Sequence, residues 1–176
     1  DFPLLSLIIT IPLLGALLAG SIRNVDVAKQ IAFFTALITF VLTACATLLF
    51  DADKSGFQLV ERYDWIPLLK IEYLVGVDGI SVLFLPMTGL LTIITMLASW
   101  SAISHSSRFH FSLLLALESV SIGVFCALDT VLFFLFWELT LPPFFFLIGL
   151  WGIGSQRRSA AMKYTLFMLA GGVTLL

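Results

Sequence analysis

Long apolar segments separated by short polar ones constrain this chain more than any other feature. Five complete segments and a sixth that runs to the last residue lie at about 2–22, 28–50, 78–100, 109–128, 130–151 and 160–176. A membrane-spanning helix needs about 20 predominantly apolar residues, and each complete segment is about that long. We therefore predict an all-α protein, a polytopic transmembrane helix bundle that forms one membrane domain over residues 1–176.

The composition supports a membrane protein and excludes several other classes. Hydrophobic residues make up 60% of the chain, and charged residues make up 11%, against roughly 25% in globular proteins. The mean hydropathy is +1.11. The 17 Phe and 4 Trp suit surfaces that face lipid and its interface, so a lipid bilayer is an expected partner. A net charge of −2 spread over loops forms no basic patch, which argues against nucleic-acid binding.

The two ends of the sequence predict a part of a longer chain. The chain begins at Asp1 without Met and ends at Leu176 inside an apolar run. The first apolar segment has no basic residues before it and no small-residue cleavage site after it. We therefore expect a retained membrane span there and not a signal peptide.

The Lys and Arg residues of alternate loops divide into two unequal groups. One side carries Arg23, Lys29, Arg108, Arg157, Arg158 and Lys163, and the other carries Lys54, Arg62 and Lys70. By the positive-inside rule the first side is cytoplasmic, which places the N-terminus on the outer or periplasmic side. The polar stretch 51–77 lies on that outer side too. Its aromatic and β-branched residues, with Pro67, predict a loop or short hairpin and not a span.

The cysteine and histidine residues do not predict a metal site. Cys45 and Cys126 are isolated in apolar sequence and are predicted to be inert buried thiols, although their positions toward one end of two helices leave a disulfide open. His105 and His110 lie beside Arg108 without a carboxylate or Cys nearby. We predict that both histidines are solvated loop residues and not metal ligands.

Hydroxyl side chains recur at helical spacing in two of the apolar segments. The third segment places them on one face, and the second carries them at steps of four: Ser81, Thr88, Thr92, Thr95 and Ser99; Thr35, Thr39, Thr43 and Thr47. In membranes such stripes favour close helix packing. Support of a water chain beside the buried carboxylates is the alternative.

Two carboxylates lie inside apolar segments, where no water solvates a charge. Glu138 lies in the fifth segment and Glu118 in the fourth. A carboxylate at the centre of a membrane helix costs about 2.5–3.5 kcal/mol, and such groups usually face a bundle interior or a wet cavity. The chain is predicted to turn near Leu128 and Asp129, which puts both acids about ten residues, or roughly 15 Å, from the turn and near mid-membrane.

Two acids at one depth indicate proton transfer. For each, a neutral packing carboxyl that is hydrogen-bonded to a neighbouring helix is the alternative, and the direction in which Glu118 faces stays open. If Glu118 meets Glu138, the two titrate as a coupled pair. Burial favours the protonated form of a carboxyl and a nearby lysine favours the charged form, so a movable cation can switch Glu138 between holding and releasing a proton.

Other residues near these acids have two interpretations each. Pro142 and Pro143 follow Glu138 by four and five residues and free backbone carbonyls near it, which favours a kink with local hydration or bending for packing alone. Asp129 is predicted to be a turn residue or a helix N-cap. Lys163 opens the sixth segment as an orientation anchor or as a partner in a proton path.

No sequence motif predicts redox chemistry on this chain. It has no phosphate-binding loop, no G-x-G-x-x-G after a strand and no haem or iron–sulfur cysteine pattern. Any redox chemistry is therefore expected on other chains.

Four stretches resemble one known family. FFLFWELTLPPFFFLIGLWG and the following RRSAAMKYTLFMLAGG closely resemble the antiporter-like chain M, or subunit 4, of proton-pumping NADH:quinone oxidoreductase, which is respiratory complex I. Upstream, VGVDGISVLFLPMTGLLT and IGVFCALDTVLFFLFWE look like the same family. The resemblance covers most of Leu59 to Leu176, and the first two helices match only in character. Pro142 departs from it, because the family more often has Ile or Val there.

The resemblance implies the N-terminal part of a larger antiporter-like subunit built from inverted helix repeats, each with a broken helix and a half-channel. Glu138 matches the family's fifth-helix Glu, which is taken to be essential for pumping. Lys163 matches a basic position at the start of the sixth helix. The lysine that pairs with the family's Glu would lie beyond Leu176.

The expected function is therefore proton translocation in NADH:quinone oxidoreductase, coupled to quinone reduction elsewhere in the complex, with Glu138 as the proton-transfer residue and Glu118 and Lys163 as further candidates. The resemblance implies that NADH, flavin, iron–sulfur clusters and quinone bind to other subunits, that this chain binds no cofactor, and that other membrane subunits of complex I are its partners. It also implies an energy-transducing membrane, such as the bacterial or mitochondrial inner membrane. A chain of a multi-subunit sodium/proton antiporter and a non-transporting structural subunit are the two alternatives.

Overall fold

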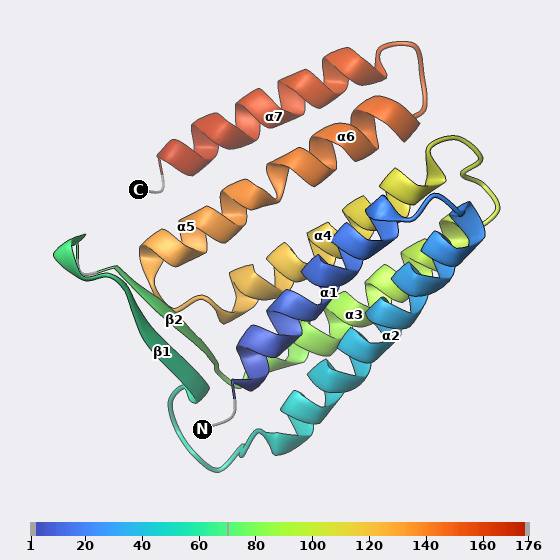
Figure 1. The fold of residues 1–176 in the computed structure, drawn as a ribbon. Helices are drawn as coiled ribbons and strands as arrows, with labels where there is room; N and C mark the ends of the chain where they lie inside the picture. Colours follow the sequence, from blue (N-terminus) through green and yellow to red (C-terminus); the bar gives the residue numbers. More distant parts are fainter. Residues whose placement is uncertain (1–2, 70, 175–176) are drawn as a thin grey trace.

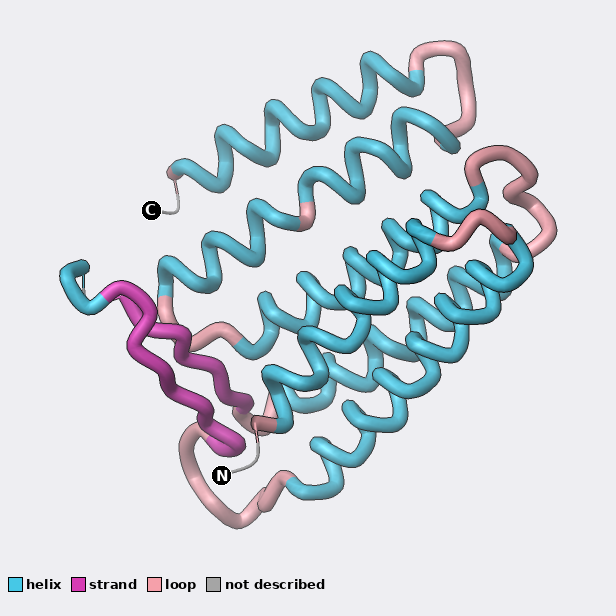
Figure 2. Tube along the Cα trace, in the orientation of Figure 1, coloured by secondary structure: helices cyan, strands magenta, loops and turns pink. Residues whose placement is uncertain are grey.

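The computed structural model describes residues 3–69 and 71–174 of the chain, and most of them are helical (Figures 1 and 2). The helices are α1 (Leu4–Ser21), α2 (Val25–Leu49), α3 (Ser81–Ser99), α4 (Ser107–Cys126), α5 (Thr130–Leu139), α6 (Leu141–Trp151) and α7 (Arg157–Val173). Helices α1 to α4 are each long and apolar enough to cross a membrane, and so is the stretch Thr130–Trp151 that α5 and α6 form together. The predicted fold class, an all-α polytopic membrane bundle, is confirmed.

Helix α4 lies at the centre of the bundle. It packs against α1, α2 and α3 on one side and against α5 and α6 on the other, while α7 lies along α5 and α6 (Figure 1). Two of its hydroxyls hold it to α1: Ser112 donates to the carbonyl of Ala16 at 2.5 Å, and Ser119 donates to that of Ile9 at 2.6 Å. The arrangement leaves α4 with a different neighbour on each face.

The threonine stripe of α2 serves helix packing. Thr39 and Thr43 are fully buried. The hydroxyl of Thr47 reaches across to α3, where it donates to the carbonyl of Val82 at 3.2 Å. Thr35 lies against Gly15 of α1 so closely that a Cβ at Gly15 would overlap its side chain. These contacts match the close packing that such stripes predict.

A two-stranded antiparallel hairpin occupies the polar stretch, as the aromatic and β-branched residues predict. Strand β1 (Gln58–Ile66) pairs with β2 (Ile71–Val77), and a short 3₁₀ turn, η1 (Pro67–Leu69), leads out of β1. Strand β2 is tied to the α4–α5 turn, because the N–H of Leu128 donates to the carbonyl of Leu74 at 2.9 Å.

Glu61 of β1 fastens the hairpin to the start of α1. Its carboxylate accepts the backbone N–H groups of Leu5 at 2.6 Å and of Ser6 at 3.1 Å, and it also accepts the Ser6 hydroxyl. That hydroxyl lies 2.9 Å from the phenol oxygen of Tyr73 on β2. A carboxylate at this position satisfies amides that have no partner within the helix and complements the positive end of the helix dipole.

Local capping explains where the helix bounds differ from the apolar segments. Helix α2 begins at Val25, ahead of the expected residue 28, because Asn24 accepts the N–H groups of Asp26 and Val27. Helix α3 begins only at Ser81, where the Asp78 carboxylate accepts the backbone N–H. The predicted N-cap at Asp129 is confirmed: its carboxylate accepts the N–H groups that start α5 at 2.9 and 3.0 Å.

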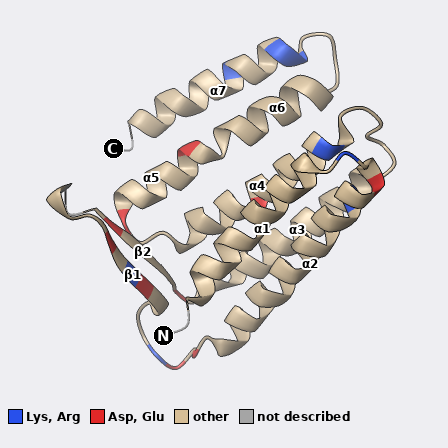
Figure 3. Cartoon of the chain, in the orientation of Figure 1, with Lys and Arg blue, Asp and Glu red and all other residues tan. Residues whose placement is uncertain are grey.

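Charged residues gather at the two ends of the bundle (Figure 3). Arg23, Arg108, Arg157 and Arg158 lie at the end that carries the α1–α2, α3–α4 and α6–α7 connections. The hairpin end carries acids together with Lys54 and Arg62, and Lys70 falls outside the described residues. This distribution agrees with the loop grouping on which the predicted orientation rests.

Candidate functional site

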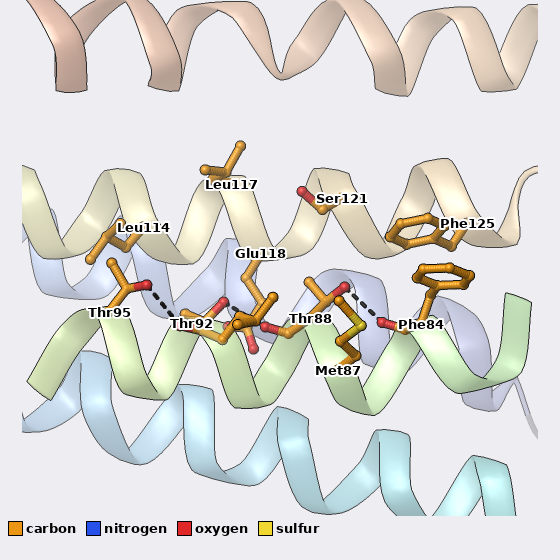
Figure 4. A pocket seen from close by; sticks show the side chains of 11 residues that line it. Phe84, Met87, Thr88, Thr92, Thr95, Leu114, Leu117, Glu118, Ser121 and Phe125 are labelled. Atoms are coloured by element: carbon orange, nitrogen blue, oxygen red, sulfur yellow. Dashed lines mark hydrogen bonds between the residues drawn. The ribbon is translucent and has the colours of Figure 1, made fainter.

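Glu118 lies between α3 and α4 at the wall of a cavity of about 380 Å³. Only 1% of the residue is exposed, and neither carboxylate oxygen has a hydrogen-bond partner among the described residues. Figure 4 shows its side chain directed from α4 toward Thr88 and Thr92 of α3. The direction of Glu118, which the sequence left open, is therefore toward α3.

Three threonines of α3 line the same cavity, and each of their hydroxyl oxygens can still accept a hydrogen bond. Thr88, Thr92 and Thr95 donate to the carbonyls four residues earlier at 2.7, 3.0 and 2.8 Å (Figure 4). With the hydroxyl hydrogen used in this way, each oxygen can still accept a hydrogen bond. The wall opposite Glu118 thus complements a protonated carboxyl or water, both of which have a hydrogen to donate.

Glu138 is the second-last residue of α5, and its carboxylate faces α7. One of its carboxylate oxygens is buried and has no hydrogen-bond partner among the described residues. The carboxylate lies directly against the backbone of Gly172, so that a Cβ added there would overlap Oε1 and would lie 3.3 Å from Cδ. Phe134, one turn earlier on α5, lies at the same contact. Glycine at position 172 is what allows the carboxylate to approach α7 this closely.

The helix is interrupted at Thr140, two residues after Glu138. The N–H of Thr140 donates to the carbonyl of Trp137 at 3.1 Å, three residues back instead of four, and the Thr140 hydroxyl donates to the same carbonyl at 2.7 Å. Pro142 has no N–H, so the carbonyl of Glu138 lacks the donor that an α-helix would supply four residues on, and only the N–H of Thr140, which it shares with Trp137, is directed at it. The sequence predicts a kink at the proline pair, and the structure has an interruption there, which places polar backbone atoms near the acid.

The two acids lie at a similar level but face different neighbours. Glu118 lies eight residues before the end of α4 and Glu138 eight residues after the start of α5, each about 12 Å along its helix at 1.5 Å per residue. Glu118 faces α3, whereas Glu138 faces α7. No direct contact joins the two carboxylates in the described part of the chain.

A second cavity, of about 290 Å³, lies on the α7 side of α4. Trp137, Thr140 and Tyr164 line it, and so do Ser121 and Phe125 of α4. Ser121 and Phe125 line the Glu118 cavity as well. These two residues of α4 thus form part of the wall of both cavities.

Lys163 is exposed near the start of α7. It precedes Gly172, the residue level with Glu138, by nine positions, which is about 13 Å along the helix. Among the residues that the structure describes, Lys163 forms no ion pair. Its roles as anchor or as path partner both remain predictions.

His110 contradicts the prediction of a solvated loop residue. It lies in the first turn of α4, only 7% exposed, with both ring nitrogens unpaired within the described chain. Its ring meets that of Trp151 edge to face at 4.8 Å, which covers it from α6. The prediction failed because the helix begins at Ser107, while His105 is exposed as expected.

The other sequence-predicted candidates are placed as follows. Cys45 and Cys126 are both free, and Cys126 is buried as predicted, whereas Cys45 is exposed. No group of His, Cys, Asp and Glu with the composition of a metal site occurs in residues 3–69 and 71–174. Sequence reasoning missed the contribution of Gly172, because a glycine pair in a membrane helix is typical of packing.

Comparisons with known proteins identify relatives of this chain. Residues 127–176 match the family described as NADH:quinone oxidoreductase/Mrp antiporter, TM. F(420)H(2) dehydrogenase subunit M of Methanosarcina mazei is 34% identical over 99% of this chain and 35% of its own length. NAD(P)H-quinone oxidoreductase chain 4 of Gloeobacter violaceus is 39% identical over 99% of this chain and 33% of its own length.

A solved structure of the Mrp complex from Dietzia sp. DQ12-45-1b has the same fold. It superposes with a TM-score of 0.76 at 22% identity and covers 98% of this chain and 18% of that one. At that identity the likeness concerns the fold alone. The chain spans about a third of the length of the curated relatives that it matches.

The long helices and their exposed apolar surfaces define an integral membrane protein. Residues 127–176 carry the transmembrane domain of the NADH:quinone oxidoreductase/Mrp antiporter type, and the whole chain is similar to chain 4 of NAD(P)H-quinone oxidoreductases, which confirms the resemblance to chain M, or subunit 4.

Proposed function

We propose that this chain is the N-terminal part of a proton-translocating subunit in a membrane complex of the NADH:quinone oxidoreductase type, and that Glu138 is its proton-holding group. The observation that carries this proposal is the buried, unpaired carboxylate oxygen of Glu138 at a break in a membrane-spanning helix. Buried carboxylates without partners are costly in a bilayer, and the default interpretation is a functional one.

The geometry around Glu138 suits a group that gains and loses a proton. On one side the carboxylate lies against the backbone of Gly172, and on the other the chain presents a carbonyl that Pro142 leaves without its usual donor. A positive charge that approaches the carboxylate favours release of the proton, and its departure favours uptake. Lys163 lies too far along α7 to supply that charge directly, so we propose a lysine outside residues 1–176.

The redox chemistry belongs to other subunits in this proposal. Relatives are named for two different electron donors, NAD(P)H and F(420)H(2). A chain that moves protons without binding the donor is compatible with either. We therefore propose that the donor, flavin, iron–sulfur clusters and quinone bind to partner subunits of the same membrane.

The proposed orientation has the N-terminus and the hairpin on the outer face of an energy-transducing membrane. Its support is the excess of Lys and Arg at the opposite end of the bundle. The acidic residues of the hairpin carry no weight in this argument, because acids contribute little to orientation.

The test is proton uptake driven by the electron donor in inverted membrane vesicles, with native and Glu138→Gln complexes compared at equal content. Electron transfer to an artificial acceptor, which occurs on other chains, measures intact assembly. We expect Glu138→Gln to lose the proton gradient while it keeps acceptor reduction. An unchanged gradient would contradict the proposal and favour a packing role for the carboxyl.

A cation/proton antiporter is a second candidate, favoured by the family description and by the Mrp complex of the same fold. It predicts sodium/proton exchange in vesicles without any electron donor. Exchange that is lost in Glu138→Gln and insensitive to the donor would favour this candidate over the first.

A further inference from the structure

Helix α4 separates the two buried acids, and this raises the question of how a proton would pass from one to the other. Glu118 faces the cavity on the α3 side, and Glu138 lies on the α5–α7 side of α4. A direct transfer needs contact within hydrogen-bond distance, which the two carboxylates do not make. A path between them must therefore pass α4 through side chains or water.

Ser121 is a polar residue of α4 that lies between the two sides. It lies three positions after Glu118 on α4, a spacing that places the two side chains on neighbouring parts of the helix surface. It lines both cavities, the one at Glu118 and the one at Thr140 and Tyr164. Phe125, the other shared residue, has no polar group to offer.

The Ser121 hydroxyl differs from the other hydroxyls of α4. Those of Ser107, Ser112 and Ser119 donate to backbone carbonyls, the last two across to α1. The Ser121 hydroxyl forms no hydrogen bond with the described residues, and in Figure 4 its oxygen is directed away from α3, whereas the Glu118 side chain extends toward α3. It is therefore free to donate to one water molecule and to accept from another.

Both cavities have the room and the polar groups that water requires. A water molecule needs about 10–15 Å³ and two to four polar partners, and the two cavities, both of which are open on one side, have volumes of about 380 and 290 Å³. The first offers Glu118 and the threonines of α3. The second offers Thr140 and Tyr164.

We propose that Glu118 is a second proton-holding site and that Ser121 positions the water through which its cavity exchanges protons with the Glu138 side of α4. Glu118 releases its proton to water in the first cavity. The Ser121 hydroxyl oxygen takes a proton from that water while its own proton passes to water in the second cavity. The proton then reaches the helix break beside Glu138, while Ser121 itself ends unchanged.

This inference rests on the proposed function, because it has no meaning if the chain moves no protons. In this inference Glu118 and Glu138 are two separate proton sites with water between them, and not a directly coupled pair of acids. Each site then has its own neighbours: Thr88 and Thr92 of α3 for Glu118, and Gly172 of α7 for Glu138.

The decisive experiment compares two variants of nearly the same shape, Ser121→Val and Ser121→Thr, in the complete complex. Both add bulk at the wall that the two cavities share, and only Thr keeps the hydroxyl. Initial proton uptake in inverted vesicles is measured per electron transferred and normalised to artificial-acceptor reduction. We expect Ser121→Val to be slower than Ser121→Thr by about tenfold, the size of effect that removal of one hydrogen bond from a limiting transfer produces.

Each result decides between the possibilities. Equal rates for Ser121→Val and Ser121→Thr, with the gradient lost in Glu138→Gln, would overturn the role of Ser121 and leave the proposed function intact. An intact gradient in Glu138→Gln would overturn the proposed function itself. If Ser121→Val does not assemble, Ser121→Ala takes its place against Ser121→Thr, and equal rates for those two would likewise overturn the inference.

Discussion

Replacement of Gly172 by alanine is a direct test of how closely Glu138 must approach α7. An added Cβ would overlap the Glu138 Oε1 atom and would lie 3.3 Å from Cδ, whereas ordinary contacts are 3.4–4 Å. The carboxylate has to move by about 1 Å or more, and a misplacement of about 1 Å in a reacting group can cost roughly 100-fold in rate. We expect Gly172→Ala to lower proton uptake by up to that factor.

The effect on stability should be much smaller than the effect on transport. Overpacking costs about 1–3 kcal/mol, and alanine in place of glycine inside a helix returns about 1 kcal/mol, which leaves a net loss of about 0–2 kcal/mol. The neighbouring Gly171 provides a matched control, since a Cβ there meets nothing within 4 Å. Gly171→Ala should therefore keep native uptake and equal or exceed native stability.

The assay is donor-driven proton uptake in vesicles, with complex content and thermal inactivation measured on the same preparations. A Gly172→Ala complex that assembles and pumps as fast as Gly171→Ala would refute the argument, because it would show that Glu138 need not lie where the structure places it.

Three further predictions concern the hairpin and the helix caps. Glu61→Gln should weaken the docking of the hairpin on α1 by about 1–2 kcal/mol, because it removes a negative charge from the N-terminus of that helix, and limited proteolysis should cleave the hairpin faster. Glu72→Gln is the control, since Glu72 pairs with Arg62 on the exposed side of the hairpin, and it should change the docking by less than about 0.5 kcal/mol. Burial raises the pKa of Tyr73 above its ordinary value near 10, partly offset by its hydrogen bond with Ser6. The folded state therefore holds the phenol proton more tightly than the unfolded state, so the stabilisation is fully present below pH 10 and is lost as the pH rises through the folded pKa; Tyr73→Phe should remove this alkaline loss in a pH series of hairpin proteolysis. Asp129→Ala should cost about 1 kcal/mol through loss of the α5 cap, and Asp129→Asn should restore most of it in thermal unfolding.

Hydropathy alone predicts the membrane helices, because the bilayer requires long apolar segments whatever their neighbours are. Helix ends depend on single caps and are less predictable. Asn24 adds nearly a turn to the start of α2, and the Asp78 carboxylate delays α3 to Ser81. The hairpin was predictable from its residue types, whereas its attachment through Glu61 to α1 was not, since the two lie 56 residues apart along the chain.

In the candidate site, too, some features could be predicted from the sequence and others could not. Glu118 and Glu138 stand out in apolar sequence, and the break after Glu138 follows from the proline pair. The directions in which the two side chains point could not be predicted from the sequence. For Glu118 the reason is that α4 is covered on nearly every side, and its sequence has no clear polar stripe that would orient the helix. His110 was misplaced for a related reason: its cover, Trp151, comes from a helix that is far away in sequence.

The attachment of the hairpin sets an order on how the chain is assembled during synthesis. Residues 58–77 hold the first turn of α1 through Glu61 and the α4–α5 turn through the carbonyl of Leu74. The amides of Leu5 and Ser6 therefore wait for their partner until more than fifty further residues have been made. The second attachment waits until Leu128 has left the ribosome. One end of the bundle is thus fastened only after α4 has been made, whereas the packing of α1 against α2 needs no later part of the chain.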